Sequence, residues 1–253
     1  MACIYSTFAP SKKQDNMRIA AKVFIPAVLG IMLLASCNNY VGQSLLHTIP
    51  NIDDYKFMPY RHVKAHPGTG LPQAADYNKA TLPDSLMWSL KHSNSVAFLV
   101  FRNDSLVYEW YDRGYSDTSF SNPFSSTKSI TGVLTGIALK QGKIKSLDEP
   151  ICKYYPEFKT NGRDSLTFKS LLTMSSGLNY YDHYLNPFGP LAKLYYGNNV
   201  KAVVNHTKQE KKPGTEWRYK NCDPQVITLA LQNAVGMNMS DFASQNLWET
   251  IGA

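Results

Sequence analysis

The segment from residue 125 to residue 142 constrains the fold most strongly, because its apolar residues follow the period of an α-helix. Apolar side chains recur at positions 130, 133, 134, 137 and 138, which predicts one apolar stripe buried against other elements. Pro123 and Ser125 stand where such a helix would begin, and Lys140 and Gly142 are typical of a helix end. We therefore expect an amphipathic helix with hydroxyl groups in its first turn.

Ser125 and Lys128 lie three residues apart and so share one face of this first turn. The hydroxyl is near the positive end of the helix dipole, and a desolvated lysine one turn away can assist in removing its proton. Ser and Lys are common, however, so one Ser-x-x-Lys match is expected by chance in a chain of 253 residues. The alternative is a solvated lysine beside a helix-capping serine, and other stretches must decide between the two.

A second informative stretch surrounds Tyr219. The Pro-Gly pair at 213–214 predicts a turn, and a short extended piece then leads to Tyr219. Apolar residues from 226 to 234 have helical spacing, and Gly236 is a typical helix end. Tyr219 and Asn221 are therefore expected on a loop just before a buried helix.

A phenol directed at Ser125 can relay a proton if Lys128 lowers the phenol's pKa. Asn221 can donate to a substrate carbonyl while it holds the lysine. The same Tyr-x-Asn form occurs at 196–198, but that copy has no flanking turn and helix, so we favour Tyr219.

Composition and charge exclude several classes of function. The chain is 43% hydrophobic and 18% charged, as in a globular protein, and its net charge of +7 is not gathered into a basic run. The pair at 211–212 is therefore interpreted as a solvated turn and not as a nucleic-acid site. His62 and His66 are four apart, but Pro67 argues against a helix that would hold both on a metal. No metal or organic cofactor is expected.

The N-terminal residues have the pattern of an export signal. A basic region at 17–22 precedes an apolar run at 23–34, which is too short to cross a bilayer, since a spanning helix needs roughly 20 apolar residues. The run ends in Leu-Ala-Ser-Cys37, which resembles the lipobox of bacterial lipoproteins. That resemblance implies a lipid attached to Cys37 and a protein anchored in the bacterial cell envelope, facing the periplasm. The alternative is an ordinary signal peptide.

These features divide the chain into three parts. Residues 1–36 are interpreted as an extension and lipoprotein signal peptide, 37–80 as a polar, proline-containing tether or irregular segment, and 81–253 as the globular domain. The true start is left open between Met1 and Met17.

Two cysteines, Cys152 and Cys222, remain in the exported part. An oxidising compartment permits a disulfide, but nothing in the sequence brings the two together. A disulfide and two free thiols therefore both remain open.

The first part of the globular domain predicts a hairpin. A short helix is expected after Pro83, an apolar strand at 95–101, a turn at 102–104 and a second strand at 106–111. The first strand is apolar throughout, so we expect both of its faces to be covered. A hairpin alone is marginally stable, so it should belong to a larger sheet.

Residues 166–178 predict a short helix that ends at Gly177, and the Tyr-, Asn- and Gly-rich residues 179–200 predict a long loop. The tyrosines of this loop either line a pocket or pack on one another at the surface. Tyr180 and Tyr181, together with Trp217, are the candidates for substrate contact. Other tyrosines of the loop are Tyr184, Tyr195 and Tyr196.

Four stretches, taken in order, resemble the serine β-lactamase family: Ser-Ser-Thr-Lys at 125–128, Leu-Leu-Thr-Met-Ser-Ser-Gly-Leu at 171–178, Pro-Gly-Thr-Glu-Trp-Arg-Tyr-Lys-Asn at 213–221, and Leu-Trp-Glu-Thr-Ile-Gly at 247–252. The similarity covers residues 80–253. It is strongest to class C β-lactamases, penicillin-binding DD-peptidases, related esterases and amide hydrolases of the 6-aminohexanoate-dimer hydrolase kind.

This resemblance implies an α+β fold, in which an antiparallel sheet is flanked by helices and adjoins a helical region. It implies a serine hydrolase that cleaves an amide or ester through an acyl-enzyme. Ser125 would be the nucleophile, Lys128 would ease its deprotonation, Tyr219 would be the general base and acid, and Asn221 the polar group beside them. The substrate is left open among a β-lactam, a D-Ala-D-Ala peptide, an ester and a linear amide, as is the oligomeric state.

One motif of this family is missing. No Lys-Thr-Gly or His-x-Gly follows Asn221, so we expect the chain to be C-terminally truncated, without the last strands of the sheet. Two alternatives to an active hydrolase therefore stay open. One is a non-catalytic envelope lipoprotein that binds peptidoglycan or a partner, and the other is an inactive truncated remnant.

Overall fold

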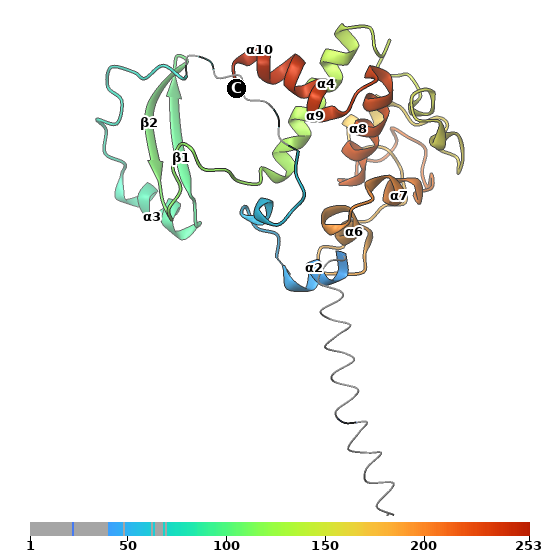
Figure 1. Cartoon of the computed structure of the whole chain (residues 1–253), viewed down its shortest axis with the longest axis horizontal. Helices are drawn as coiled ribbons and strands as arrows, with labels where there is room; N and C mark the ends of the chain where they lie inside the picture. The colour runs from blue at the N-terminus through green and yellow to red at the C-terminus, as the bar shows by residue number, and fades with distance from the viewer. Residues whose placement is uncertain (1–21, 23–39, 48, 62, 64–67, 69) are drawn as a thin grey trace, which may run out of the picture.

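The computed structural model describes residues 22, 40–47, 49–61, 63, 68 and 70–253. The predicted signal and Cys37 lie outside these residues, as do His62 and His66. In Figure 1 a hairpin with one helix lies to one side and a larger helical body to the other. Within the described part, no helix is long and apolar enough to span a membrane.

The described elements are mostly short helices, together with one two-stranded sheet. The helices are α2 (Tyr40–Leu46), α3 (Asp84–His92), α4 (Thr127–Lys140), α5 (Phe168–Leu172), α6 (Pro190–Tyr196), α7 (Val200–Asn205), α8 (Cys222–Val235), α9 (Met239–Ala243) and α10 (Glu249–Ile251), with strands β1 (Ala97–Arg102) and β2 (Ser105–Tyr111). Single 3-10 turns are η1 (Asp54–Lys56), η2 (Phe124–Ser126), η3 (Ile151–Lys153) and η4 (Pro156–Lys159), and η5 (Ser244–Trp248) is a π-helical turn.

The core is built on the packing of α4 against α8. The predicted stripe of α4 is buried at Leu134 and Ala138, and α8 contributes the buried face that includes Val226 and Ala230. Gly236 ends α8 in the left-handed conformation (φ 75°), which a residue without Cβ adopts readily. Both helices predicted around the site are therefore present, and their packing fixes the first turn of α4 beside the start of α8.

The hairpin is formed by the predicted residues, but its burial differs from the prediction. β1 and β2 pair antiparallel, with Ala97 opposite Tyr111 and an irregularity after Val100. We expected both faces of the first strand to be covered, and this is wrong: Leu99, Val100 and Phe101 are exposed. The physical reason is that the described sheet has only two strands, so no further strand covers Leu99, Val100 and Phe101.

Two predicted elements need correction, and a third segment contains helices. The helix at 166–178 ends at Leu172, because Met174 takes a left-handed backbone (φ 55°) that an α-helix cannot continue. The predicted loop at 179–200 contains α6, which begins at Pro190, a favoured first helical residue, and buries Ala192. The predicted tether or irregular segment at 37–80 contains α2 and η1, and α2 packs against α6.

Cys152 and Cys222 are both free thiols.

Candidate active site

Ser125 lies at the junction of η2 and α4, in the last turn before the long helix begins. The residue before it, Phe124, has a left-handed backbone (φ 45°), a conformation that costs a bulky residue on the order of 1 kcal/mol and is concentrated at functional sites. Its N–H donates to Oδ1 of Asn122 at 3.0 Å. The nucleophile candidate is therefore presented on a constrained turn, with its side chain exposed.

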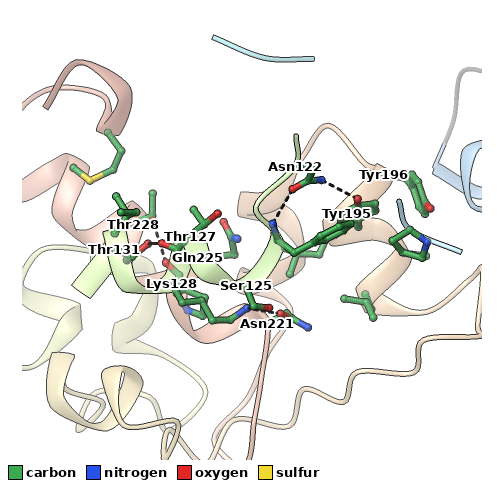
Figure 2. Close-up of a pocket in the computed structure, with 18 of the residues that line it drawn as sticks. Asn122, Ser125, Thr127, Lys128, Thr131, Tyr195, Tyr196, Asn221, Gln225 and Thr228 are labelled. Atoms are coloured by element: carbon green, nitrogen blue, oxygen red, sulfur yellow. Dashed lines mark hydrogen bonds between the residues drawn. The ribbon is translucent and has the colours of Figure 1, made fainter. Parts of the chain in front are cut away.

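Four side chains predicted from the sequence meet at this turn. The hydroxyls of Ser125 and Tyr219 are 2.7 Å apart, and Nζ of Lys128 donates to Oγ of Ser125 at 3.0 Å. The same Nζ donates to Oδ1 of Asn221 at 2.8 Å. Figure 2 shows Ser125, Lys128 and Asn221 side by side. The two pairs predicted from the sequence, Ser125 with Lys128 and Tyr219 with Asn221, therefore meet at one point.

The loop that carries Tyr219 is fixed to the segment that follows α5. Gly214 donates its N–H to the carbonyl of Ser175, and Arg218 donates its N–H to the carbonyl of Met174, each at 2.8 Å. Asn221, at the start of α8, donates its own N–H to Oδ2 of Asp182 at 3.0 Å. The segment Leu171–Leu178 therefore holds the loop that carries Tyr219, although it gives the site no reacting group.

The surroundings of Tyr219 lower the pKa of its hydroxyl. Burial raises the pKa of the Tyr219 hydroxyl, and the charge of Asp182 acts in the same direction. The hydrogen bonds with Lys128 and Ser125 and the charge of Lys128 outweigh both, so that the pKa lies below the ordinary tyrosine value. The ammonium also lies 4.9 Å from the centre of the phenol ring, in cation–π contact.

A cavity of about 570 Å³ opens at Ser125. Its wall is largely apolar, and among the described lining residues Lys128 is the only charged one. Aromatic and aliphatic side chains on the wall include Phe124, Leu191, Leu194, Tyr195 and Tyr196. A pocket with an apolar wall and a few polar groups at one end is typical of sites for small organic substrates.

The three residues predicted to contact substrate do not line this cavity. Tyr180 is buried in the core, and the hydroxyl of Tyr181 donates to Glu210. Trp217 is 69% exposed and is not among the residues that line the cavity. The loop tyrosines that do line the cavity are Tyr184, Tyr195 and Tyr196.

Tyr196, in the second Tyr-x-Asn stretch, lines the cavity, but its hydroxyl donates to the carbonyl of His47. The hydroxyl of Tyr219, by contrast, contacts Ser125. Sequence reasoning missed Asn122 and Asp54, which contact Tyr195 near the nucleophile. The only sequence signal for these contacts is the Asn-Pro pair at 122–123. Such a pair indicates a turn, but it does not indicate which residues the turn contacts. Within the described residues, no group of three or more His, Cys, Asp or Glu could hold a metal ion.

The chain belongs to the β-lactamase family, whose family model, described as Beta-lactamase, matches residues 84–253. It is 22% identical over 236 residues to the 6-aminohexanoate-dimer hydrolase of Paenarthrobacter ureafaciens, covering 81% of this chain and 58% of that protein. The predicted family and the predicted β-lactamase/transpeptidase-like α+β fold are therefore confirmed.

Solved structures show the same fold. A Bacillus anthracis protein assigned as a 6-aminohexanoate-dimer hydrolase superposes with a TM-score of 0.68 at 21% identity, over 85% of this chain and 61% of that one. A class C β-lactamase gives a TM-score of 0.50 at 17% identity, over 65% and 46%. The chain thus spans about three-fifths of the first relatives it matches.

Proposed function

We propose that this chain carries the acyl-transfer centre of a serine hydrolase that cleaves an amide or ester bond. The observation that carries the proposal is the meeting of Ser125 Oγ with both the Tyr219 hydroxyl at 2.7 Å and the Lys128 ammonium at 3.0 Å. A serine hydroxyl is a weak nucleophile unless a positioned base takes its proton, and a phenol of lowered pKa within hydrogen-bond distance is such a base.

In the proposed reaction, Oγ of Ser125 attacks the carbonyl carbon of the substrate as the Tyr219 phenolate takes the hydroxyl proton. A bond forms between Oγ and the carbonyl carbon, and Tyr219 returns the proton to the leaving amine or alcohol as the C–N or C–O bond breaks. Water then attacks the acyl carbon and gives a proton to Tyr219. As the bond between Oγ and this carbon breaks, Tyr219 returns the proton to Oγ of Ser125 and the acid is released. Lys128 stabilises the phenolate throughout, and Asn221 holds Lys128.

Covalent labelling tests the nucleophile directly. A fluorophosphonate probe should modify the wild-type chain on the peptide that contains Ser125, and Ser125→Ala should abolish labelling. Ser126→Ala is the matched control, because Ser126 is the exposed neighbour and is not one of the four side chains that meet at the site. Equal labelling of the wild type and Ser125→Ala would remove Ser125 from the mechanism and leave a binding role as the better account.

The substrate class is tested by comparing bond types on one enzyme preparation. One relative is named for hydrolysis of the 6-aminohexanoate dimer, a linear amide, and the family is named for β-lactams. We propose that the acyl side of a small amide or ester occupies the apolar cavity beside Ser125. Turnover of the linear amide dimer, a chromogenic cephalosporin and a p-nitrophenyl ester, each compared with Ser125→Ala, ranks the three bond types.

We also propose that the protein is exported and anchored by a lipid on Cys37, on the strength of the Leu-Ala-Ser-Cys pattern. Metabolic labelling with an alkyne fatty acid in a bacterial host tests this. Label in the wild type that is lost in Cys37→Ser supports the anchor. Equal label in both proteins would exclude Cys37 as the attachment site.

A further inference from the structure

We propose that residues 49–58, which precede the part of the chain matched by the family model, position the nucleophile through Asp54, Tyr195 and Asn122. This inference rests on the proposed role of Ser125. Residues 49–58 belong to the stretch predicted as a tether or irregular segment, and they would thereby have a place in the active site.

The first contact is made by Asp54. This carboxylate is only 4% exposed, and its Oδ2 accepts the hydroxyl proton of Tyr195 at 3.0 Å and the N–H of Asn51 at 2.9 Å. A buried carboxylate must be hydrogen-bonded to be tolerated, and Tyr195 is the side-chain donor that the structure gives it. Asp54 therefore ties η1 to the end of α6.

Tyr195 is hydrogen-bonded to both Asp54 and Asn122. Burial and the neighbouring Asp54 raise the pKa of the Tyr195 hydroxyl. The hydroxyl therefore stays protonated and donates a hydrogen bond to the carboxylate. Its oxygen then accepts from Nδ2 of Asn122 at 3.1 Å, a bond visible in Figure 2. The direction of each bond is fixed, because an uncharged phenol has a single proton to give.

Asn122 connects the segment to the turn that carries Ser125. Its backbone N–H donates to the carbonyl of Ile52 at 2.7 Å, and its Oδ1 accepts the N–H of Phe124 at 3.0 Å. Backbone and side chain of this one residue therefore join residues 51–54 to the turn preceding the helix.

Phe124 is the residue on which these contacts act. Its left-handed backbone persists only where the surroundings impose it, and its ring also stacks on Tyr195, with centroids 6.2 Å apart and planes at 12°. Ser125 follows directly in the chain. Releasing Phe124 to an ordinary backbone conformation would therefore turn the next residue away from Tyr219.

Pro50 of this segment lines the cavity, as does Ser44 of α2 just before it. The chain just before residue 49 is held at a second point, where the hydroxyl of Tyr196 donates to the carbonyl of His47. Residues 49–58 thus contact the turn that precedes Ser125, and these residues and the chain just before them contribute to the cavity wall.

The test uses Asp54→Ala in the 253-residue chain, with Asp53→Ala as the matched control. Asp53 is the adjacent acid, and its side chain pairs with Lys56 at the surface. For Asp54→Ala we expect the maximal rate of fluorophosphonate labelling to fall roughly 10- to 100-fold, because a small misplacement of a reacting group has effects of that size. The probe concentration for half-maximal rate should change little, and Asp53→Ala should behave as the wild type.

Two further variants separate positioning from general destabilisation. Asp54→Asn keeps an acceptor for Tyr195 and should recover part of the lost rate. Tyr195→Phe keeps the stack on Phe124 but loses both hydroxyl bonds, so it should slow labelling while the chain stays folded. An equal loss of rate in Asp53→Ala, or wild-type labelling by both Asp54→Ala and Tyr195→Phe, would overturn the proposal.

Hydrogen–deuterium exchange gives a readout that does not need activity. The peptide covering residues 120–126 should exchange faster in Asp54→Ala and in Tyr195→Phe than in the wild type or in Asp53→Ala. If the wild type is not labelled at all, the proposed function fails, and exchange alone decides the positioning role. Unchanged exchange at 120–126 in both variants would then overturn the inference independently.

Discussion

The hydroxyl of Tyr219 lies 2.7 Å from Oγ of Ser125, although 93 residues separate the two in the sequence. Tyr219 enters on the loop before α8 and Ser125 on the turn before α4, so the packing of these two helices brings the pair together. The two residues on which the proposed chemistry depends are thus positioned by the core.

Tyr219→Phe should reduce hydrolysis of a p-nitrophenyl ester on the order of 100- to 10,000-fold, the range typical of losing a general base. The ring and its contact with Lys128 are retained, so the free energy of unfolding should change little. Tyr181→Phe is the control, because that hydroxyl binds Glu210 away from the cavity. Wild-type turnover by Tyr219→Phe would exclude the phenol as the base.

The pH dependence of acylation should follow the lowered pKa of Tyr219. The phenolate is the reactive form, so the rate rises with pH through this pKa, and the midpoint should fall below the ordinary tyrosine value of 10. Lys128→Met removes the charge and hydrogen bond that lower the pKa, and should move the midpoint to higher pH. The rate of ester hydrolysis, measured from neutral to alkaline pH, gives the midpoint.

Asp182→Asn provides a control of opposite sign for this pH dependence. The charge of Asp182 raises the pKa of Tyr219, and removing it should move the midpoint to lower pH. Shifts of the same sign in Lys128→Met and Asp182→Asn would contradict the electrostatic account of the site.

Asn221→Asp tests how the site uses its lysine. Oδ1 of Asn221 accepts from Lys128 at 2.8 Å, and a carboxylate there would bind the ammonium more strongly and add a negative charge near Tyr219. The pKa of Tyr219 should rise, and hydrolysis at neutral pH should fall roughly 10-fold or more, since each unit of pKa changes the phenolate fraction about tenfold. Asn221→Ala should slow the reaction without the alkaline shift, which separates the loss of an acceptor from the gain of a charge.

The candidate site could largely be predicted because its residues sit at spacings that local structure fixes. Three residues along a first helical turn place Ser125 beside Lys128 whatever the rest of the fold does. The Pro-Gly turn and the helix after it place Tyr219 and Asn221 on one loop, and the resemblance to a family then supplies their meeting. Each of these signals is local and visible in the sequence.

The remaining features depend on tertiary contacts that leave no local signal. The left-handed backbone of Phe124 is imposed by Asn122 and Tyr195, and an aromatic residue gives no hint of it. Polar composition suggested a tether around Asp54, whereas the docking of that segment depends on α6, which is more than 130 residues away in sequence. Strand β1 differs in the opposite direction. Its apolar sequence predicts a strand covered on both faces, but among the described residues the sheet has only two strands and much of β1 is exposed.

Arg163 provides a stability prediction for the helical body that supports the site. The guanidinium is fully buried, donates to the carbonyls of Glu157 at 2.8 Å and Thr160 at 3.1 Å, and lies 4.0 Å from the centre of the Phe158 ring. It also donates to the carbonyl of Asn205 at the end of α7, and so joins that helix to η4.

Arg163→Met should lower the free energy of unfolding by about 3 kcal/mol or more, because several buried carbonyls lose their donor and each costs about 1–3 kcal/mol when left unpaired. Arg113→Met is the control: this exposed arginine bonds to Asn94 near the hairpin, and its loss should cost no more than about 0.5 kcal/mol. Urea unfolding followed by circular dichroism measures both. Equal midpoints for the two variants would show that the helical body does not depend on the buried guanidinium.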